Sequence, residues 1–197
     1  MSTLVVAPLL VALCTAILTL LARSSLRLQQ GVSLLGAVAY LGAAAALFDR
    51  VVLGGATFVY QVGDWSAPFG ITLVGDALSA FMLGLAAIVS LGALAYAVLY
   101  VDDYGQRLTF HPLYHFMVVG VSGSFLTGDV FNLFVWFEVM LMSSYVLVLF
   151  YGGREHTRAA LNYVVLNLLG SAVMLVAIGG IYATTGTLNM ADLARRL

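Results

Sequence analysis

The chain has 197 residues, of which 62% are hydrophobic and 9% charged, and its mean hydropathy is +1.05. A soluble domain carries roughly 25% charged residues, so this composition excludes a water-soluble globular fold and indicates a chain surrounded mostly by lipid. The net charge of −1 without a basic block argues against nucleic acid as a partner, and the single cysteine excludes a disulfide framework or a cysteine metal site.

Six apolar stretches are long enough, or nearly long enough, to cross a bilayer, which takes about 20 residues. They are residues 4–22, 32–48, 77–101, 112–127, 130–151 and 159–182. The first has no positive segment ahead of its apolar run, so we interpret it as a retained helix and not as a signal peptide. The expected fold class is therefore an all-α integral membrane protein with about six transmembrane helices.

A sizeable loop, TFVYQVGDWSAPFGITLVGD, separates the second and third predicted helices. It alternates partly between apolar and polar residues and turns at DWSAP, which predicts a short β-hairpin at about residues 51–75. Backbone outside helices avoids the hydrocarbon, so we expect the hairpin at the membrane surface, with Tyr60 and Trp65 in the interfacial zone.

Arginine counts predict the orientation, because the chain contains no lysine. One set of loops holds Arg23, Arg27, Arg107, Arg154 and Arg158, and the other set with the C-terminal tail holds Arg50, Arg195 and Arg196. The richer set is expected in the cytoplasm. This places the N-terminus and an extracytoplasmic hairpin outside.

An isolated acid in the fifth predicted helix is the strongest functional signal. Glu138 lies in FNLFVWFEVMLMSSYV, eight residues past Val130, and so about 12 Å into a span of about 30 Å. A charge near the midplane costs at least about 2.5–3.5 kcal/mol, and such acids usually mark ion or proton pathways. We expect a buried proton or cation site facing a hydrated pocket. The alternative is a neutral acid that bonds to a neighbouring helix.

Two further groups could belong to a proton pathway. His111 and His115 are four apart on one face of the fourth helix, and an unperturbed pKa of about 6.5 would let them relay protons from the cytoplasm. The alternative is a pair of interfacial histidines. Asn167 and Ser171, with Tyr163 four residues earlier, form a polar stripe on the sixth helix. That stripe either bonds across helices or lines a water file reaching Glu138.

Two aspartates precede predicted helices. Asp76 opens the third helix and Asp129 opens the fifth. Both positions suit an N-cap that accepts a hydrogen bond from a free backbone N–H, and a charge at the mouth of an ion pathway would look the same. In the fourth helix, the small residues of GVSGS predict close packing against a neighbour.

At Glu138 and beyond, the sequence resembles a known family. The stretch SGSFLTGDVFNLFVWFEVMLMSSYVLVLFYGGREHTRAALNYVVLNLLGSAVMLVAIGGIYATTGTLNMADLA, together with GDALSAFMLG, resembles the D-type subunit of Mrp-type multisubunit cation/proton antiporters. Relatives include the antiporter-like membrane subunits of respiratory complex I and of membrane-bound hydrogenases. The resemblance covers essentially the whole chain and is most specific over residues 122–194.

The resemblance implies a fold of about fourteen helices built around two inverted five-helix repeats, of which this chain would be the N-terminal portion. Residues 1–110 would then hold three transmembrane helices and the hairpin. Residues 111–197 would hold the fourth to sixth helices, at the start of the first repeat, and a truncated connecting segment. Glu138 matches the family's glutamate on the fifth helix, which pairs with a lysine on the seventh. We expect that lysine beyond Leu197.

The implied function is that of a proton-translocating subunit of a multisubunit sodium/proton antiporter in the bacterial plasma membrane. Its partners would be the other subunits, the lipid bilayer, H⁺ and Na⁺ or another monovalent cation. The resemblance implies no cofactor, and a secondary transporter subunit rather than an enzyme. Two alternatives stay open: the equivalent proton-pumping subunit of complex I or a membrane-bound hydrogenase, and a non-transporting membrane scaffold.

Overall fold

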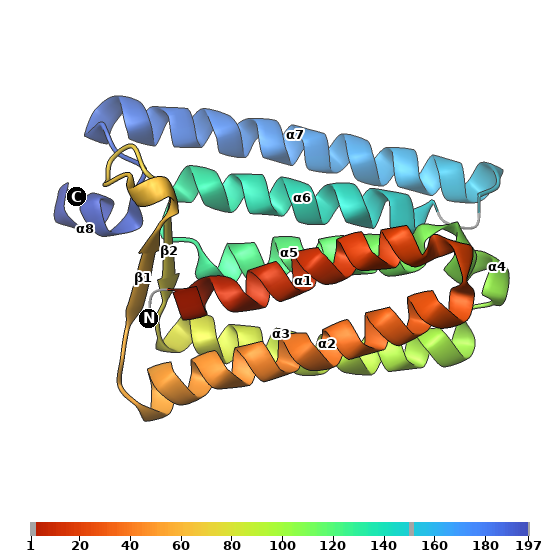
Figure 1. The fold of residues 1–197 in the computed structure, drawn as a ribbon. Helices are drawn as coiled ribbons and strands as arrows, with labels where there is room; N and C mark the ends of the chain where they lie inside the picture. The colour runs from red at the N-terminus through yellow and green to blue at the C-terminus, as the bar shows by residue number, and fades with distance from the viewer. Residues whose placement is uncertain (1–2, 150–151, 197) are drawn as a thin grey trace.

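Long apolar helices run side by side as an up-and-down bundle (Figure 1). The computed structural model describes residues 3–149 and 152–196, apart from the side chains of residues 107 and 108. The long helices are α1 (Thr3–Leu21), α2 (Leu26–Phe48), α3 (Ala77–Tyr100), α5 (His111–Leu126), α6 (Val130–Val148) and α7 (Arg154–Thr185). The short elements are α4 (Asp103–Gly105), α8 (Met190–Arg196), the 3₁₀ turns η1 (Ala22–Ser24) and η3 (Val62–Asp64), and the π-helical turns η2 (Asp49–Leu53) and η4 (Gln106–Phe110).

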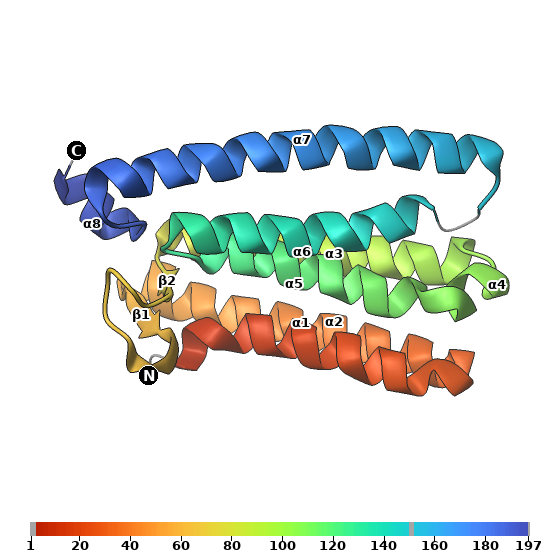
Figure 2. The same ribbon diagram turned by 90° about the horizontal axis from the view of Figure 1, so that it is seen from above.

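Five helical segments of the described chain are long and apolar enough to cross a membrane. They are Thr3–Ser24, Leu26–Leu53, Ala77–Tyr100, Val130–Val148 and Arg154–Thr185. The remaining predicted span, α5, has 16 residues, and it lies inside the bundle against α1 and α6 (Figures 1 and 2). The expected all-α, multi-pass membrane protein is confirmed.

Helix boundaries differ from the sequence-based expectation at polar residues. The second helix begins at Leu26 instead of residue 32, directly after Ser25 in an extended conformation. Its first turns include Gln29, which is buried and whose Nε2 donates to the Thr19 carbonyl (3.1 Å). The sixth predicted helix extends to Arg154–Thr185, and Gly186 ends it in the left-handed conformation at φ 70°. The fifth ends at Val148, whereas its expected end at Tyr151 lies outside the described residues.

The predicted β-hairpin is present. Strands β1 (Phe58–Gln61) and β2 (Thr72–Gly75) pair antiparallel, with Phe58 opposite Gly75 and Gln61 opposite Thr72. The hairpin is shorter than expected, because residues 49–53 form η2 after α2. It lies at the same end of the bundle as the N-terminus (Figure 1). Trp65 in its loop is exposed.

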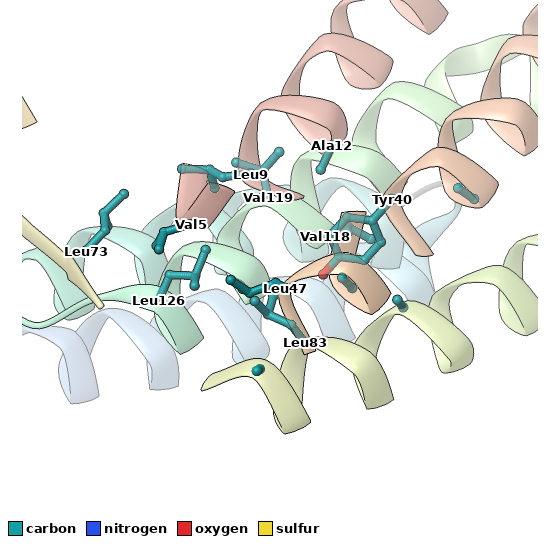
Figure 3. Packing of buried hydrophobic residues seen from close by; sticks show 14 of the residues in the cluster. Val5, Leu9, Ala12, Tyr40, Leu47, Leu73, Leu83, Val118, Val119 and Leu126 are labelled. Carbon is teal, nitrogen blue, oxygen red and sulfur yellow. The ribbon is translucent and has the colours of Figure 1, made fainter. Parts of the chain in front are cut away.

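A single apolar core joins α1, α2, α3 and α5. Figure 3 shows its centre, where Val5, Leu47 and Leu126 from three helices meet. The core contains residues from both the 1–110 and the 111–197 segments. The expected division of the chain at residue 110 stays a prediction. The predicted close packing of the fourth helix occurs at α6, where a Cβ on Gly120 would lie 2.7 Å from the Met140 backbone nitrogen.

Helix α7 forms an outer layer of the molecule and packs against α6 (Figure 2). Most of its side chains are exposed in the described chain. Its C-terminal end is held by a polar cap, which we define as Thr72, the turn at residues 127–130 and the segment 187–190. The cap contains backbone hydrogen bonds from Gly128 N to the Thr72 oxygen (2.8 Å) and from Val130 N to the Leu188 oxygen (2.9 Å). The cap therefore ties the hairpin to both the α5–α6 turn and the end of α7.

Candidate functional site

Glu138 lies in the middle of α6 on a side that faces α7. Its Oε1 accepts a hydrogen bond from the Ser171 hydroxyl of α7. The side chain is half-buried, so the described chain covers it only in part. An ionisable carboxyl group thus sits between two helices that are otherwise almost entirely apolar over their middle turns. The expected burial of Glu138 stays a prediction, because the described chain leaves the side chain half-buried.

The polar stripe on α7 faces the same side of α6. The Tyr163 and Ser144 hydroxyls lie 3.2 Å apart, and the Tyr163 ring meets the Tyr145 ring edge-on at 5.4 Å. Asn167 donates to the Tyr163 carbonyl (2.9 Å), so its amide bonds within its own helix. We call this group the α6–α7 seam; it comprises Glu138, Ser144, Tyr145, Tyr163, Asn167 and Ser171.

The two histidines belong to a different group, which we call the histidine cluster: Gln30, Ser33, Gln106, His111 and His115. Both imidazoles are buried, with exposed fractions of 0% and 2%. The Ser33 hydroxyl of α2 lies 3.0 Å from Nδ1 of His111 and 2.8 Å from Nε2 of His115. Both rings are buried within the bundle, and their place relative to the membrane surface stays a prediction. The described hydrogen bonds do not connect them to Glu138.

Both aspartates cap helices at the hairpin end of the bundle. Asp76 accepts from the Ser79 N–H at the start of α3, and Asp129 accepts from the Asn132 N–H at the start of α6, each at 2.8 Å. Burial raises the pKa of Asp129, and the backbone N–H groups of Asn132 and Phe131 oppose that shift. Asp129 also lines a cavity of about 150 Å³ with Tyr182 of α7. Across residues 3–149 and 152–196, no three His, Cys, Asp or Glu side chains group closely enough to hold a metal ion.

Comparison with known proteins finds chains that are similar to this one. Residues 127–197 match the family model described as "NADH:quinone oxidoreductase/Mrp antiporter, TM". The D-type subunit of the sodium/proton antiporter of Alkalihalophilus pseudofirmus is 41% identical over 194 residues, which cover 98% of this chain and 39% of that protein. Over nearly all of its length, the chain is therefore similar to D-type subunits of Mrp-type antiporters.

Two solved structures contain chains with the same fold over nearly the whole of this chain. The Mrp complex from Dietzia sp. contains a chain that is 34% identical, with a TM-score of 0.85 over 97% of this chain and 36% of that one. The membrane-bound sulfane sulfur reductase, an archaeal respiratory membrane complex, contains one that is 29% identical, with a TM-score of 0.86 over 98% and 39%. The chain thus spans about two-fifths of the length of the Alkalihalophilus pseudofirmus subunit and of the sulfane sulfur reductase chain. The resemblance to the D-type Mrp subunit is confirmed.

Three polar residues of the two clusters were not predicted from the sequence: Tyr145, Ser33 and Gln106. Tyr145 lies seven residues after Glu138, a spacing of about two turns that places it on the same side of α6, and this could have been read from the sequence. Ser33 and Gln106 gave no such signal, because their partners lie on other helices. They belong to the histidine cluster, which composition and periodicity do not predict.

Proposed function

We propose that this chain forms part of a proton-translocating membrane subunit of a multisubunit sodium/proton antiporter, and that Glu138 carries the proton. The observation that supports this most directly is the Glu138 carboxyl group on an apolar helix, bonded to Ser171 of α7. The match to the family model and the similarity to the D-type subunits of sodium/proton antiporters support the reaction class.

In this proposal, the α6–α7 seam handles the proton. Ser171 donates a hydrogen bond to the Glu138 carboxyl group. Uptake of a proton neutralises the carboxyl, and its carbonyl oxygen then accepts a weaker hydrogen bond than a carboxylate does, so the Ser171 hydroxyl is held less firmly. The rotatable hydroxyls of Ser144 and Tyr163 lie along the same seam and would carry the proton to and from Glu138. Downhill proton entry would drive export of Na⁺ or another monovalent cation elsewhere in the complex.

The substitution Glu138→Gln in the complete antiporter complex tests this role. Glutamine keeps the shape and can still accept from Ser171, but it carries no exchangeable acid proton. We expect cation-dependent proton movement, followed with a pH-sensitive dye in inverted membrane vesicles, to fall by about 100-fold or to background, the scale of losing a positioned proton-transfer group. The subunit should still assemble at normal levels.

Glu155→Gln is the matched control, because Glu155 is exposed in the first turn of α7. It should leave antiport unchanged. Normal antiport by Glu138→Gln in a normally assembled complex would contradict the proton-carrying role and favour the non-transporting scaffold.

A second candidate function is the equivalent subunit of a redox-driven pump. The similarity to a chain of the sulfane sulfur reductase, at 29% identity, favours it. Purification of the native complex distinguishes the two: redox subunits would support the pump, and small membrane subunits without redox centres would support the antiporter.

The position in the cell is part of the same proposal. We place the chain in a bacterial plasma membrane, with the N-terminus and the hairpin on the outer face and with the other subunits as partners. The positive-inside rule supports this orientation. The turn after α1, with Arg23, and the start of α7, with Arg154 and Arg158, lie at the α4 end of the bundle (Figure 1). The turn after α2, with Arg50, and α8, with Arg195 and Arg196, lie at the hairpin end.

A further inference from the structure

The histidine cluster forms a continuous chain of hydrogen bonds between helices α2 and α5. Gln30 Nε2 donates to Gln106 Oε1 (2.6 Å), and the same oxygen lies 3.3 Å from Nε2 of His111. On its other side, His111 Nδ1 lies 3.0 Å from the Ser33 hydroxyl, which lies 2.8 Å from Nε2 of His115. The chain therefore runs from a half-buried amide to a fully buried imidazole.

The amide of Gln106 fixes the direction of this chain. Its Nε2 faces two carbonyl oxygens, those of Val101 (2.6 Å) and Val98 (3.3 Å). An amide nitrogen can donate to carbonyls, whereas an amide oxygen cannot, so the Gln106 orientation is determined. The oxygen Oε1 must then face the histidine and accept.

Each following bond is set by the one before it. Because Gln106 Oε1 only accepts, Nε2 of His111 carries the hydrogen. A neutral imidazole holds one hydrogen, so Nδ1 of His111 is bare and accepts from the Ser33 hydroxyl. The single hydroxyl hydrogen of Ser33 is used in that bond, so the Ser33 oxygen accepts from Nε2–H of His115. Every donor in the resting chain points from His115 towards Gln106.

We propose that His115, Ser33 and His111 form a proton relay, separate from the α6–α7 seam, in which the Ser33 hydroxyl passes one proton between the two imidazoles. A proton that binds Nδ1 of His115 turns that ring into an imidazolium. Its Nε2 proton moves to the Ser33 oxygen as the Ser33 proton moves to Nδ1 of His111. His115 ends neutral, Ser33 is again a hydroxyl, and His111 becomes the imidazolium.

The proton stops at His111 for a chemical reason. Its Nε2–H still donates to Gln106 Oε1, and a neutral amide oxygen does not take the proton on. Two imidazolium rings around one hydroxyl would repel each other, so the relay holds one proton and not two. Another polar neighbour in contact with these rings is Tyr114, which meets His115 edge-on at 5.7 Å and donates to the Ser90 carbonyl of α3 (2.7 Å).

The relay rests on the proposed function, because a proton-translocating subunit would supply the proton that the relay carries. The relay lies elsewhere in the bundle, since Ser33 is on α2 and both histidines are on α5, whereas Glu138 lies between α6 and α7. The two ideas can therefore fail independently.

Histidine ring-nitrogen NMR on the complete complex in lipid, labelled with ¹⁵N-histidine, tests the relay directly. We expect both rings to be Nε2–H tautomers at neutral pH and to take up a single proton together on acidification. Ser33→Ala should abolish this joint behaviour, so that each ring titrates alone, and Ser33→Thr should restore it. Independent titration in the wild type, or joint titration in Ser33→Ala, would overturn the relay.

Antiport in the same vesicles supplies the second readout. We expect Ser33→Ala to lower the rate about fivefold, on the scale of one lost hydrogen bond, and Ser33→Thr to recover it. The matched control is Ser143→Ala, because Ser143 is also buried but bonds to the Val139 carbonyl of its own helix (3.1 Å). Full activity of Ser33→Ala would overturn the relay while leaving the Glu138 proposal standing. Glu138→Gln should leave the histidine signals unchanged.

Discussion

Asp129 begins α6 as a nearly buried carboxylate, with an exposed fraction of 7%. Two opposing effects act on it. Burial penalises its charge and raises its pKa, whereas the Asn132 and Phe131 N–H groups favour the charge. Since burial is the larger effect, the folded protein binds a proton at Asp129 more tightly than the unfolded chain does. The ionised side chain therefore costs stability once the pH rises above its folded-state pKa.

Asp129→Asn should consequently raise the apparent unfolding temperature of the detergent-solubilised complex at pH 7. Asparagine caps a helix as well as aspartate does, without a charge to bury. The advantage should vanish as the pH falls towards about 4, where the wild-type side chain is neutral as well. Asp129→Ala should instead cost about 1 kcal/mol, because it removes the cap. A variant Asp129→Asn less stable than wild type at pH 7 would show that the charge at the helix start outweighs burial.

The sequence predicts the location of some functional residues but not the hydrogen-bond partners of others. Glu138 could be found because an apolar run fixes its helix and the rise per residue fixes its depth. The partner of the histidines could not, since Ser33 is 78 residues from His111 and 82 from His115. Periodicity shows which side chains share a face, but not which helix lies opposite. How helices pack against one another, and not the sequence pattern, determines that His111 and His115 lie apart from Glu138.

At the scale of elements, the contact between α5 and α6 depends on glycine. A Cβ on Gly120 would meet the Met140 backbone, and one on Gly123 would meet the Trp136 ring. Backbone atoms cannot rotate away as a side chain can. The predicted close packing of the GVSGS segment could be read from residue size, whereas the identity of the neighbouring helix could not.

Gly120→Ala should therefore destabilise the subunit by about 1–3 kcal/mol, the range of overpacking a well-filled interface. The decrease should appear as a lower unfolding temperature of the complex. Gly92→Ala is the matched control, because no atom lies within 4 Å of a Cβ at that position in α3. It should be neutral or stabilising by up to about 1 kcal/mol, the usual difference between alanine and glycine in a helix. Equal effects of both changes would contradict the close contact.

The whole molecule has two unlike ends. The hairpin, the N-terminus and the polar cap lie at one end, and α4 lies at the other (Figure 1). Alternation of the long helices was predictable from hydropathy and loop length. The polar cap was not, because its bonds join segments far apart in the sequence, such as Asn189 Nδ2 and Thr72 Oγ1 at 3.2 Å.

The two ends can be assigned to the two faces of the membrane by thiol labelling. In a Cys14→Ser background, Ser66→Cys marks the hairpin loop and Ser24→Cys marks the opposite end; both serines are exposed. A membrane-impermeant maleimide applied to intact cells should label the first variant and not the second. Both should react after the membrane is permeabilised. The reverse pattern would invert the proposed orientation.

The register of α5 against α6 has an electrical consequence. Gly120 faces Met140 and Gly123 faces Trp136, so Glu138 stands level with the α5 turn between those glycines. His115 lies earlier on α5, about 10 Å away along the bundle axis. This is about a third of the hydrocarbon thickness, and a charge moved that far gains or loses about 0.8 kcal/mol per 100 mV of membrane potential. A proton held at the histidine cluster and one held at Glu138 are thus weighted differently by voltage.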